Sequence, residues 1–127
     1  MKRNPKIMVC VTRQKTCARL IKTGVKISTE NKGELSVVHV AKQGENILGN
    51  PKEGEALEYL FQISKEAGAD MTVLRSERIV DTLVDFAKKH EITIVVMGES
   101  PYSKSDTNII RQLEVRLPDV EIRVIPA

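Results

Sequence analysis

Short apolar runs and longer periodic segments follow one another along the chain. The runs at residues 6–11 and 92–97 are apolar almost throughout, as is typical of parallel strands that are covered on both faces. Between such runs, apolar residues recur three and four positions apart, as they do on one face of a helix. The pattern predicts that strands and helices alternate.

The predicted strands lie at residues 6–11, 35–40, 70–74, 92–97 and 120–125. The predicted helices lie at residues 14–31, 51–67 and 106–117 and in the stretch after Ser76. We expect Gly33 to end the first helix and Ser76 to cap the third. Alternating elements predict an α/β fold, an open five-stranded parallel sheet with helices on both faces. The 127 residues fit a single domain.

Two segments in the first half of the chain are less regular. In the second helix we assign four residues to the apolar stripe: Leu57, Leu60, Phe61 and Ser64. The stretch from Ala41 to Pro51 contains Gly44 and Gly49 and is expected to be a looser connection. It imitates the opening of a phosphate-binding P-loop, but the Lys and the Ser or Thr that should follow are missing.

Composition argues against several classes of protein. A total of 20 basic and 17 acidic residues gives a net charge of +3, and this charge is too balanced for a nucleic-acid groove. Aromatic residues make up 3%, too few to stack on nucleic-acid bases. No apolar stretch approaches the roughly 20 residues of a membrane span, and we expect a cytoplasmic protein. Cys10 and Cys17 form no metal or redox motif, and we expect both to be packing thiols.

Candidate chemistry gathers after the first and fourth predicted strands. Ligands of open parallel sheets bind beyond the carboxyl ends of the strands, where the strand order changes direction. The first such loop contains Thr12, Arg13 and Gln14. In the second, Gly98 lets a ligand approach the backbone, and hydroxyl and amide groups follow it: Ser100, Ser105, Thr107 and Asn108. A helix that begins near Ser105 or Thr107 would direct its free N–H groups at an anion.

A simpler interpretation of the same residues remains open. Ser, Thr and Asn also cap helices, and Gly with Pro also forms turns, whether or not a ligand binds. His39 lies at the polar end of a predicted strand, where a packed, hydrogen-bonded histidine is commoner than a catalyst. The sequence shows no metal-ligand pattern and no catalytic set of nucleophile and base, so we expect a protein that is not an enzyme.

The chain resembles the universal stress protein family from Lys6 to Pro126. The segments KIMVCV, IVVMG and VEIRVIP carry the resemblance, together with the helix that begins near Gln14. Within the family it is most similar to the stress-protein domain of the potassium-sensor kinase KdpD, through the segments VCVT and ARLIKTGVKIS. The resemblance implies the strand order 3-2-1-4-5 and a ligand site at the first and fourth strands.

Two motifs of the family bear on the ligand. Members that bind ATP carry G-x-x-G and, further on, G-S/T; here Pro101 replaces the second glycine and Thr107-Asn108 stands at the final pair. ATP is therefore expected to bind weakly. KdpD-like domains that bind cyclic di-AMP carry S-x-S and, further on, F-T-A-x-Y. Residues 12–14 and 35–39 have that spacing, which implies ligand contacts from Ser36, His39 and the adjacent Val40.

Two functions remain open from the sequence. One is a non-enzymatic signalling module that binds cyclic di-AMP or ATP. The other is a structural or partner-binding module of the same fold with an empty pocket, and its partner would be a signalling kinase or a transporter. The last strand, 120–125, alternates and is expected at a sheet edge. Pairing of this edge with a second copy would give a homodimer.

Overall fold

The computed structural model describes residues 4–99 and 104–126, and in the last helix it describes side chains from Ile109 onward. In chain order the elements are β1 (Lys6–Cys10), α1 (Gln14–Asn31), β2 (Glu34–Ala41), the 3-10 helix η1 (Ile47–Gly49), α2 (Glu53–Glu66), β3 (Asp70–Arg75), α3 (Ile79–Lys89), β4 (Ile94–Gly98), α4 (Lys104–Arg116) and β5 (Glu121–Ile125). Every strand and helix that the sequence predicts is present, and η1 is an additional element.

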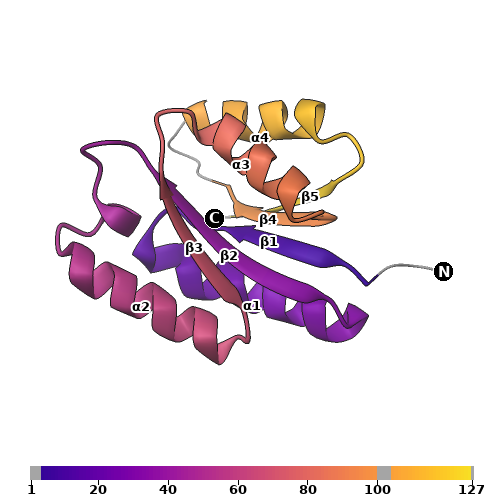
Figure 1. Ribbon diagram of the computed structural model, residues 1–127, viewed down its shortest axis with the longest axis horizontal. Coiled ribbons are helices and arrows are strands. Elements are labelled where there is room, and N and C mark those ends of the chain that lie inside the picture. The colour runs from indigo at the N-terminus through magenta and orange to yellow at the C-terminus, as the bar shows by residue number, and fades with distance from the viewer. Residues whose placement is uncertain (1–3, 100–103, 127) are drawn as a thin grey trace.

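Five parallel strands form one sheet in the order β3-β2-β1-β4-β5, which confirms the α/β fold and its strand order (Figure 1). β1 lies at the centre, where Val9 pairs with Val37 of β2 and Val96 of β4. All three side chains are completely buried. The unbroken apolar runs therefore mark strands that are covered on both faces. β3 and β5 are the two edge strands, as predicted for β5.

Helices cover both faces of the sheet. Figure 1 shows α1 and α2 on one face and α3 and α4 on the other. Alternate residues of β1 belong to the two layers, because successive side chains of a strand point to opposite faces. Ile7 and Val9 pack with α1 and α2, whereas Met8 and Cys10 pack with α3 and α4. The sheet thus separates two hydrophobic cores. No helix in the described part of the chain is long and apolar enough to cross a membrane.

α1 approaches the sheet closely at Gly24. A Cβ at this position would lie 2.6 Å from Cγ2 of Val9 and 2.9 Å from Cδ1 of Leu35. A close-packed core has no room for such contacts. The absence of a side chain at Gly24 therefore lets α1 lie directly against β1 and β2.

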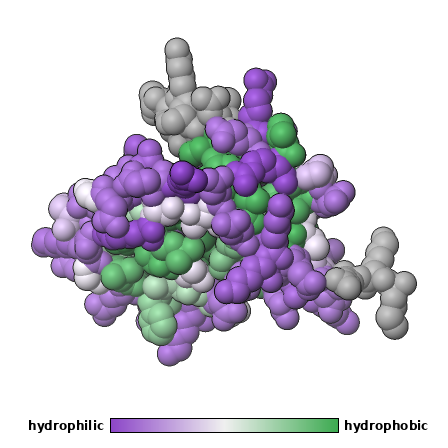
Figure 2. Space-filling model, turned by 45° about the horizontal axis from the view of Figure 1, so that its top comes forward, coloured by the Kyte–Doolittle hydropathy of each residue, from purple (hydrophilic) through white to green (hydrophobic). Residues whose placement is uncertain are grey.

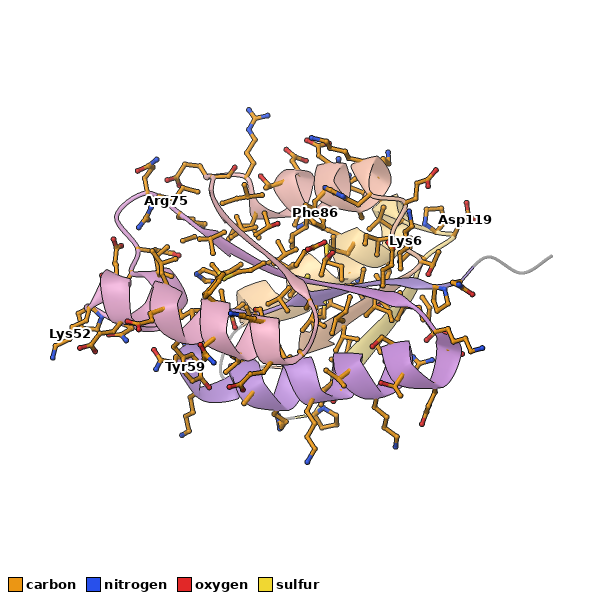
Figure 3. The ribbon with its side chains drawn as sticks, turned by 60° about the horizontal axis from the view of Figure 1, so that its bottom comes forward. Lys6, Lys52, Tyr59, Arg75, Phe86 and Asp119 are labelled. Carbon is orange, nitrogen blue, oxygen red and sulfur yellow. The ribbon has the colours of Figure 1, made fainter. Side chains whose placement is uncertain are left out.

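The buried stripe of α2 differs from the prediction. Leu60 and Ser64 are buried as expected, and Ala56 joins them, but Leu57 is 36% exposed and Phe61 is 55% exposed. Tyr59 lies on the side of α2 that faces α1 (Figure 3), and a residue two positions further on lies on the opposite flank of a helix. The assignment of Leu57 and Phe61 to the core was wrong, because the buried stripe of α2 runs through Ala56, Leu60 and Ser64.

Both predicted helix caps are corrected. Lys32, and not Gly33, adopts the left-handed conformation at the end of α1, with φ of 54°. Gly33 is instead required for space, because a Cβ there would lie 2.6 Å from the carbonyl oxygen of Pro5. α3 begins after Arg78. Ser76 lies in the preceding turn, where its hydroxyl accepts a hydrogen bond from the N–H of Arg78 (3.0 Å).

The connection from Ala41 to Pro51 is exposed and irregular over residues 42–46, as predicted, but the additional element η1 packs into the core. Ile47 and Leu48 of η1 are 3% and 2% exposed and pack with the α1–α2 core. Leu48 has φ of 55°, in a region that residues with a Cβ rarely adopt. The segment follows β2 and therefore lies at the carboxyl ends of the strands, where a ligand site is expected.

Candidate functional site at the carboxyl ends of β1 and β4

The carboxyl ends of β1 and β4 lie side by side in the sheet. Cys10 pairs with Met97, so Gly98, the last residue of β4, is level with Val11. The chain leaves β1 into α1 on one face of the sheet and leaves β4 into α4 on the other face (Figure 1). The strand order changes direction at this pair of strands, and such a point opens the crevice in which ligands of α/β proteins bind.

The loop after β1 supplies polar groups to this end of the sheet, where the strand order predicts a crevice. Thr12 and Arg13 are exposed, and Gln14 is the half-buried first residue of α1. Arg13 occupies the N-cap position of α1, and no side-chain hydrogen bond caps the helix there. The first N–H groups of α1 and the charge of Arg13 therefore give this part of the crevice a positive potential, which favours an anion.

Gly98 is not required by the fold. Its φ is not positive. A Cβ at this position would make only ordinary contacts, 3.5 Å from Cδ1 and 3.6 Å from Cδ2 of Leu20. Neither backbone conformation nor packing therefore explains a glycine at the end of β4, whereas close approach of a ligand to the backbone would explain it.

The predicted residues beyond Gly98 are described only in part. Ser100 lies outside the described residues. α4 begins at Lys104, two residues before the start of the predicted helix at residue 106. The backbone of Ser105, Thr107 and Asn108 thus lies in the first turns of α4, at the end of the helix that carries its free N–H groups.

Ser36 lies far from the other predicted site residues. It pairs with Met8 in β1, four residues before Thr12, and at a rise of about 3.3 Å per residue the two levels are about 13 Å apart. Figure 3 shows Lys6 and Arg75 toward opposite ends of the molecule. Ser36 lines a groove of about 710 Å³ at the amino-terminal ends of the strands, together with Lys6. The prediction that Ser36 shares a ligand with Thr12 is therefore corrected.

His39 is a buried structural residue, and its side chain is 4% exposed. Its Nδ1–H donates to the carbonyl oxygen of Val11 (2.8 Å), and its Nε2 accepts from the N–H of Leu48 (3.0 Å). Burial lowers the pKa of His39, assisted by the charge of Arg75 and opposed by the Val11 carbonyl and the charge of Glu45. Both nitrogens are bonded within the protein and the ring is enclosed, so the predicted contact of His39 with a ligand is wrong.

Val40 does lie near the carboxyl ends of the strands. Cys10 pairs with Val38, so Val40 is level with Thr12, and it is half-buried. The structure therefore places five of the predicted residues at the same end of the sheet, namely Thr12, Arg13, Gln14, Val40 and Gly98. It places His39 beneath them and Ser36 at the other end of the sheet.

Asn50 is a residue at this end of the sheet that the sequence did not indicate. Its Nδ2 donates to Oε1 of Gln14 (2.9 Å), and its Oδ1 accepts from the N–H of Lys52 (2.9 Å). The one signal in the sequence is the Gly-Asn-Pro turn at residues 49–51. That signal marks a turn but cannot pair Asn50 with Gln14, which lies 36 positions earlier.

Cys10 and Cys17 are packing thiols, as predicted. Both are buried, and burial raises the pKa of each thiol to about 12. Such a thiol stays protonated near neutral pH, and the thiolate is the reactive form. The described residues contain no group of three or more His, Cys, Asp or Glu side chains that could hold a metal ion.

Comparison with known proteins shows the family. Residues 4–109 match the family model described as the universal stress protein family, and the chain belongs to that family. It is 25% identical over 124 residues to the sensor protein KdpD of Synechocystis sp.. That match covers 94% of this chain but 33% of the sensor protein, so the chain spans about a third of the length of this relative.

Solved structures share the fold. A universal stress protein in complex with cAMP superimposes with a TM-score of 0.72 at 12% identity, over 98% of each chain. The universal stress protein UspA of Lactobacillus plantarum gives 0.68 at 17% identity, over 99% of each chain. The universal stress protein of Archaeoglobus fulgidus in complex with dAMP gives 0.55 at 16% identity, over 99% of this chain and 98% of that chain. At these identities the likeness shows the fold alone.

Proposed function

We propose that this chain is a non-enzymatic signalling module that binds an adenine nucleotide beyond the carboxyl ends of β1 and β4. The observation that carries the proposal is the junction of these two strand ends at a change of strand order, with Thr12 and Arg13 on one and Gly98 on the other. Two structural relatives were solved with cAMP and dAMP, which supports an adenine ligand.

Among adenine nucleotides we favour cyclic di-AMP over ATP. An exposed helix N-terminus stabilises a nearby anion by about 0.3–1 kcal/mol, which suits the singly charged phosphates of a cyclic dinucleotide better than a triphosphate. Pro101 stands where ATP-binding members have a glycine, and proline has no N–H to donate to phosphate. We therefore expect ATP to bind more weakly than cyclic di-AMP.

Calorimetric titration with cyclic di-AMP and with ATP tests the proposal. Thr12→Val and Gly98→Ala should each weaken the binding of cyclic di-AMP by about tenfold, which corresponds to about 1.4 kcal/mol. Alanine fits at position 98 without a clash, so any loss there reports on the ligand and not on folding. Thr23→Val is the matched control, because this α1 hydroxyl bonds within its own helix (Thr23 to Arg19, 3.2 Å). No binding of either nucleotide would refute the proposal.

A second candidate function is a partner-binding module with an empty pocket. It is favoured by the exposed side chains of Leu57 and Phe61. Each lies two positions from Tyr59, which faces α1 in Figure 3, and therefore lies on the opposite flank of α2. Figure 2 shows apolar surface among hydrophilic side chains on the side of the molecule where α2 and β3 lie. Exposed apolar patches of this kind often mark protein–protein contacts. The partner proposed is a signalling kinase or a transporter.

Binding to an isolated sensor-kinase fragment, measured by interferometry without nucleotide, tests this second function. Phe61→Glu should abolish the interaction, because it places a charge in the apolar flank. Val115→Glu on α4 is the control, since Val115 is also apolar and is 73% exposed. A contact through α2 would be ruled out if both variants lost binding equally or if neither variant lost binding.

A further inference from the structure

We propose that Gln14 and Asn50 together read the base edge of the adenine ligand, and that His39 and Arg75 hold the segment that carries Asn50. This inference rests on the proposed nucleotide function and adds the residues that select adenine over guanine.

The two amide side chains retain hydrogen-bonding capacity. A carboxamide offers two N–H donors and two acceptor lone pairs. In Asn50, one N–H is bonded to Gln14 and one lone pair receives the N–H of Lys52. Within the described residues, Asn50 therefore keeps one donor and one acceptor, and Gln14 keeps the N–H groups of its Nε2.

A donor beside an acceptor matches adenine. The exposed edge of adenine presents the N6–H donor next to the N7 acceptor, and Asn or Gln forms two hydrogen bonds with it. The same edge of guanine presents two acceptors, N7 and O6. An amide can make one good hydrogen bond to that edge and leaves its own oxygen facing an acceptor. The pair of amides therefore discriminates between the two purines.

The position of the pair suits a base whose phosphate lies in the crevice. Gln14 is the first residue of α1 and follows the exposed Thr12 and Arg13. Asn50 lies just before α2, and both amides are partly buried. Figure 3 shows Lys52, two residues after Asn50, at the same end of the molecule as Arg75. A base against the amides and a phosphate at the start of α1 would thus be neighbours.

Two residues outside the crevice fix the segment that carries Asn50. Arg75 donates hydrogen bonds to the carbonyl oxygens of Lys42 (3.1 Å) and Glu45 (3.0 Å) and pairs with the carboxylate of Glu53. His39 accepts a hydrogen bond from the N–H of Leu48, in the middle of the segment. The segment is therefore held at its start, at its middle and at its end. A side chain that binds a ligand must be positioned within a fraction of an ångström, and such positioning needs a rigid segment.

Parallel titrations with cyclic di-AMP and cyclic di-GMP test the inference. The unaltered chain should bind the adenine compound at least about tenfold more tightly, because its base edge can form two hydrogen bonds with an amide. Asn50→Leu should bring the ratio of the two affinities close to one. Gln62→Leu is the matched control: its amide is exposed on α2 and bonds to Glu66 within the helix, so the ratio should not change.

Arg75→Gln tests the role of the holding residues. Arg75 is partly exposed, so the variant should fold, and its ratio of affinities should fall toward one because Asn50 is no longer held in place. A purely structural role would lower both affinities equally. Asn50→Leu that keeps the adenine preference would overturn this inference and leave the nucleotide proposal intact. A chain that binds neither compound would overturn both.

Discussion

The N–H of Leu48 donates to Nε2 of His39 at 3.0 Å, and this bond joins a left-handed residue to a buried ring. Leu48 has φ of 55°, a conformation that costs a residue with a Cβ about 1–2 kcal/mol. An unpaired N–H at a site that is 2% exposed would cost about 1–3 kcal/mol more. The bond therefore stabilises η1, and it requires a neutral His39, because a protonated ring has no acceptor.

The stability of the protein should accordingly depend on pH through His39. Its pKa in the folded state is lowered from 6.5, chiefly by burial, so the unfolded state binds the proton more readily. The contribution of His39 to the free energy of unfolding is then complete above pH 6.5 and is lost as the pH falls through the folded pKa. Urea denaturation at several values between about pH 5 and pH 8 measures this loss.

His39→Gln identifies the residue responsible. Near neutral pH it should lower the free energy of unfolding by about 1–3 kcal/mol, since a buried hydrogen-bonded site is disturbed, and it should remove most of the decline below pH 6.5. His90→Gln is the control, because His90 is exposed beside Phe86 at the end of α3. An unchanged decline in His39→Gln would show that other groups cause the acid sensitivity.

The strands of this fold were predictable because burial on both faces leaves a continuous apolar run, as in β1 and β4. The roles of His39 and Ser36 were not, because each depends on how far along the sheet the residue lies. A one-dimensional spacing matches Thr12 and Ser36 to one motif, yet the parallel register pairs Ser36 with Met8. The partner of His39, the carbonyl of Val11, lies 28 positions away and has no side-chain signature.

The face that α2 buries was predicted only in part, for a different reason. A helical period fixes the spacing of the core residues but not the direction in which the stripe points. Leu57 and Phe61 outweigh Ala56 in hydrophobicity, yet Ala56 is completely buried. A close-packed core selects residue size as well as polarity, which a pattern of apolar positions does not record.

Gly24→Ala should destabilise the protein by about 1–3 kcal/mol, the usual result of overpacking a core. The added methyl group would lie 2.6 Å from Cγ2 of Val9, and β1 cannot move without disturbing both cores. Gly54→Ala in α2 is the matched control, because nothing lies within 4 Å of a Cβ there. It should stabilise by about 0.5–1 kcal/mol through helix propensity. Denaturant titration of both variants measures their free energies of unfolding. Equal changes in the two variants would contradict the close approach of α1 to the sheet.

The end of α1 offers a second pair of opposite changes. Lys32→Gly should stabilise by about 0.5–1 kcal/mol, because glycine adopts φ of 54° without the penalty that a Cβ brings. Gly33→Ala should destabilise, since its methyl group would meet the backbone oxygen of Pro5 at 2.6 Å, which a flexible side chain cannot relieve. Thermal unfolding of the two variants compares them directly. If Gly33 were the left-handed cap, Lys32→Gly would instead give no gain.

Self-association should occur through β5, an edge strand that bonds on one side to β4. The N–H of Glu121 donates to the carbonyl of Thr93 (3.0 Å), so the N–H of the next residue, Ile122, points away from the sheet. The β5 strand of a second copy, related by a two-fold axis, could form hydrogen bonds with the outward backbone groups of β5, so that the two strands form an antiparallel pair. Light scattering should then give twice the mass of the 14.2 kDa chain.

Ile122→Pro should convert this dimer into a monomer, because proline removes an outward N–H donor and leaves the bonds to β4 intact. Val73→Pro is the matched control at the other edge of the sheet. The N–H of Ser76 donates to the carbonyl of Ala41 (2.9 Å), so by alternation the N–H of Val73 also points away from its neighbour strand. The β5 interface requires a monomer for Ile122→Pro and a dimer for Val73→Pro. The reverse result would assign the interface to β3. A monomeric parent chain at micromolar concentration would exclude both edges.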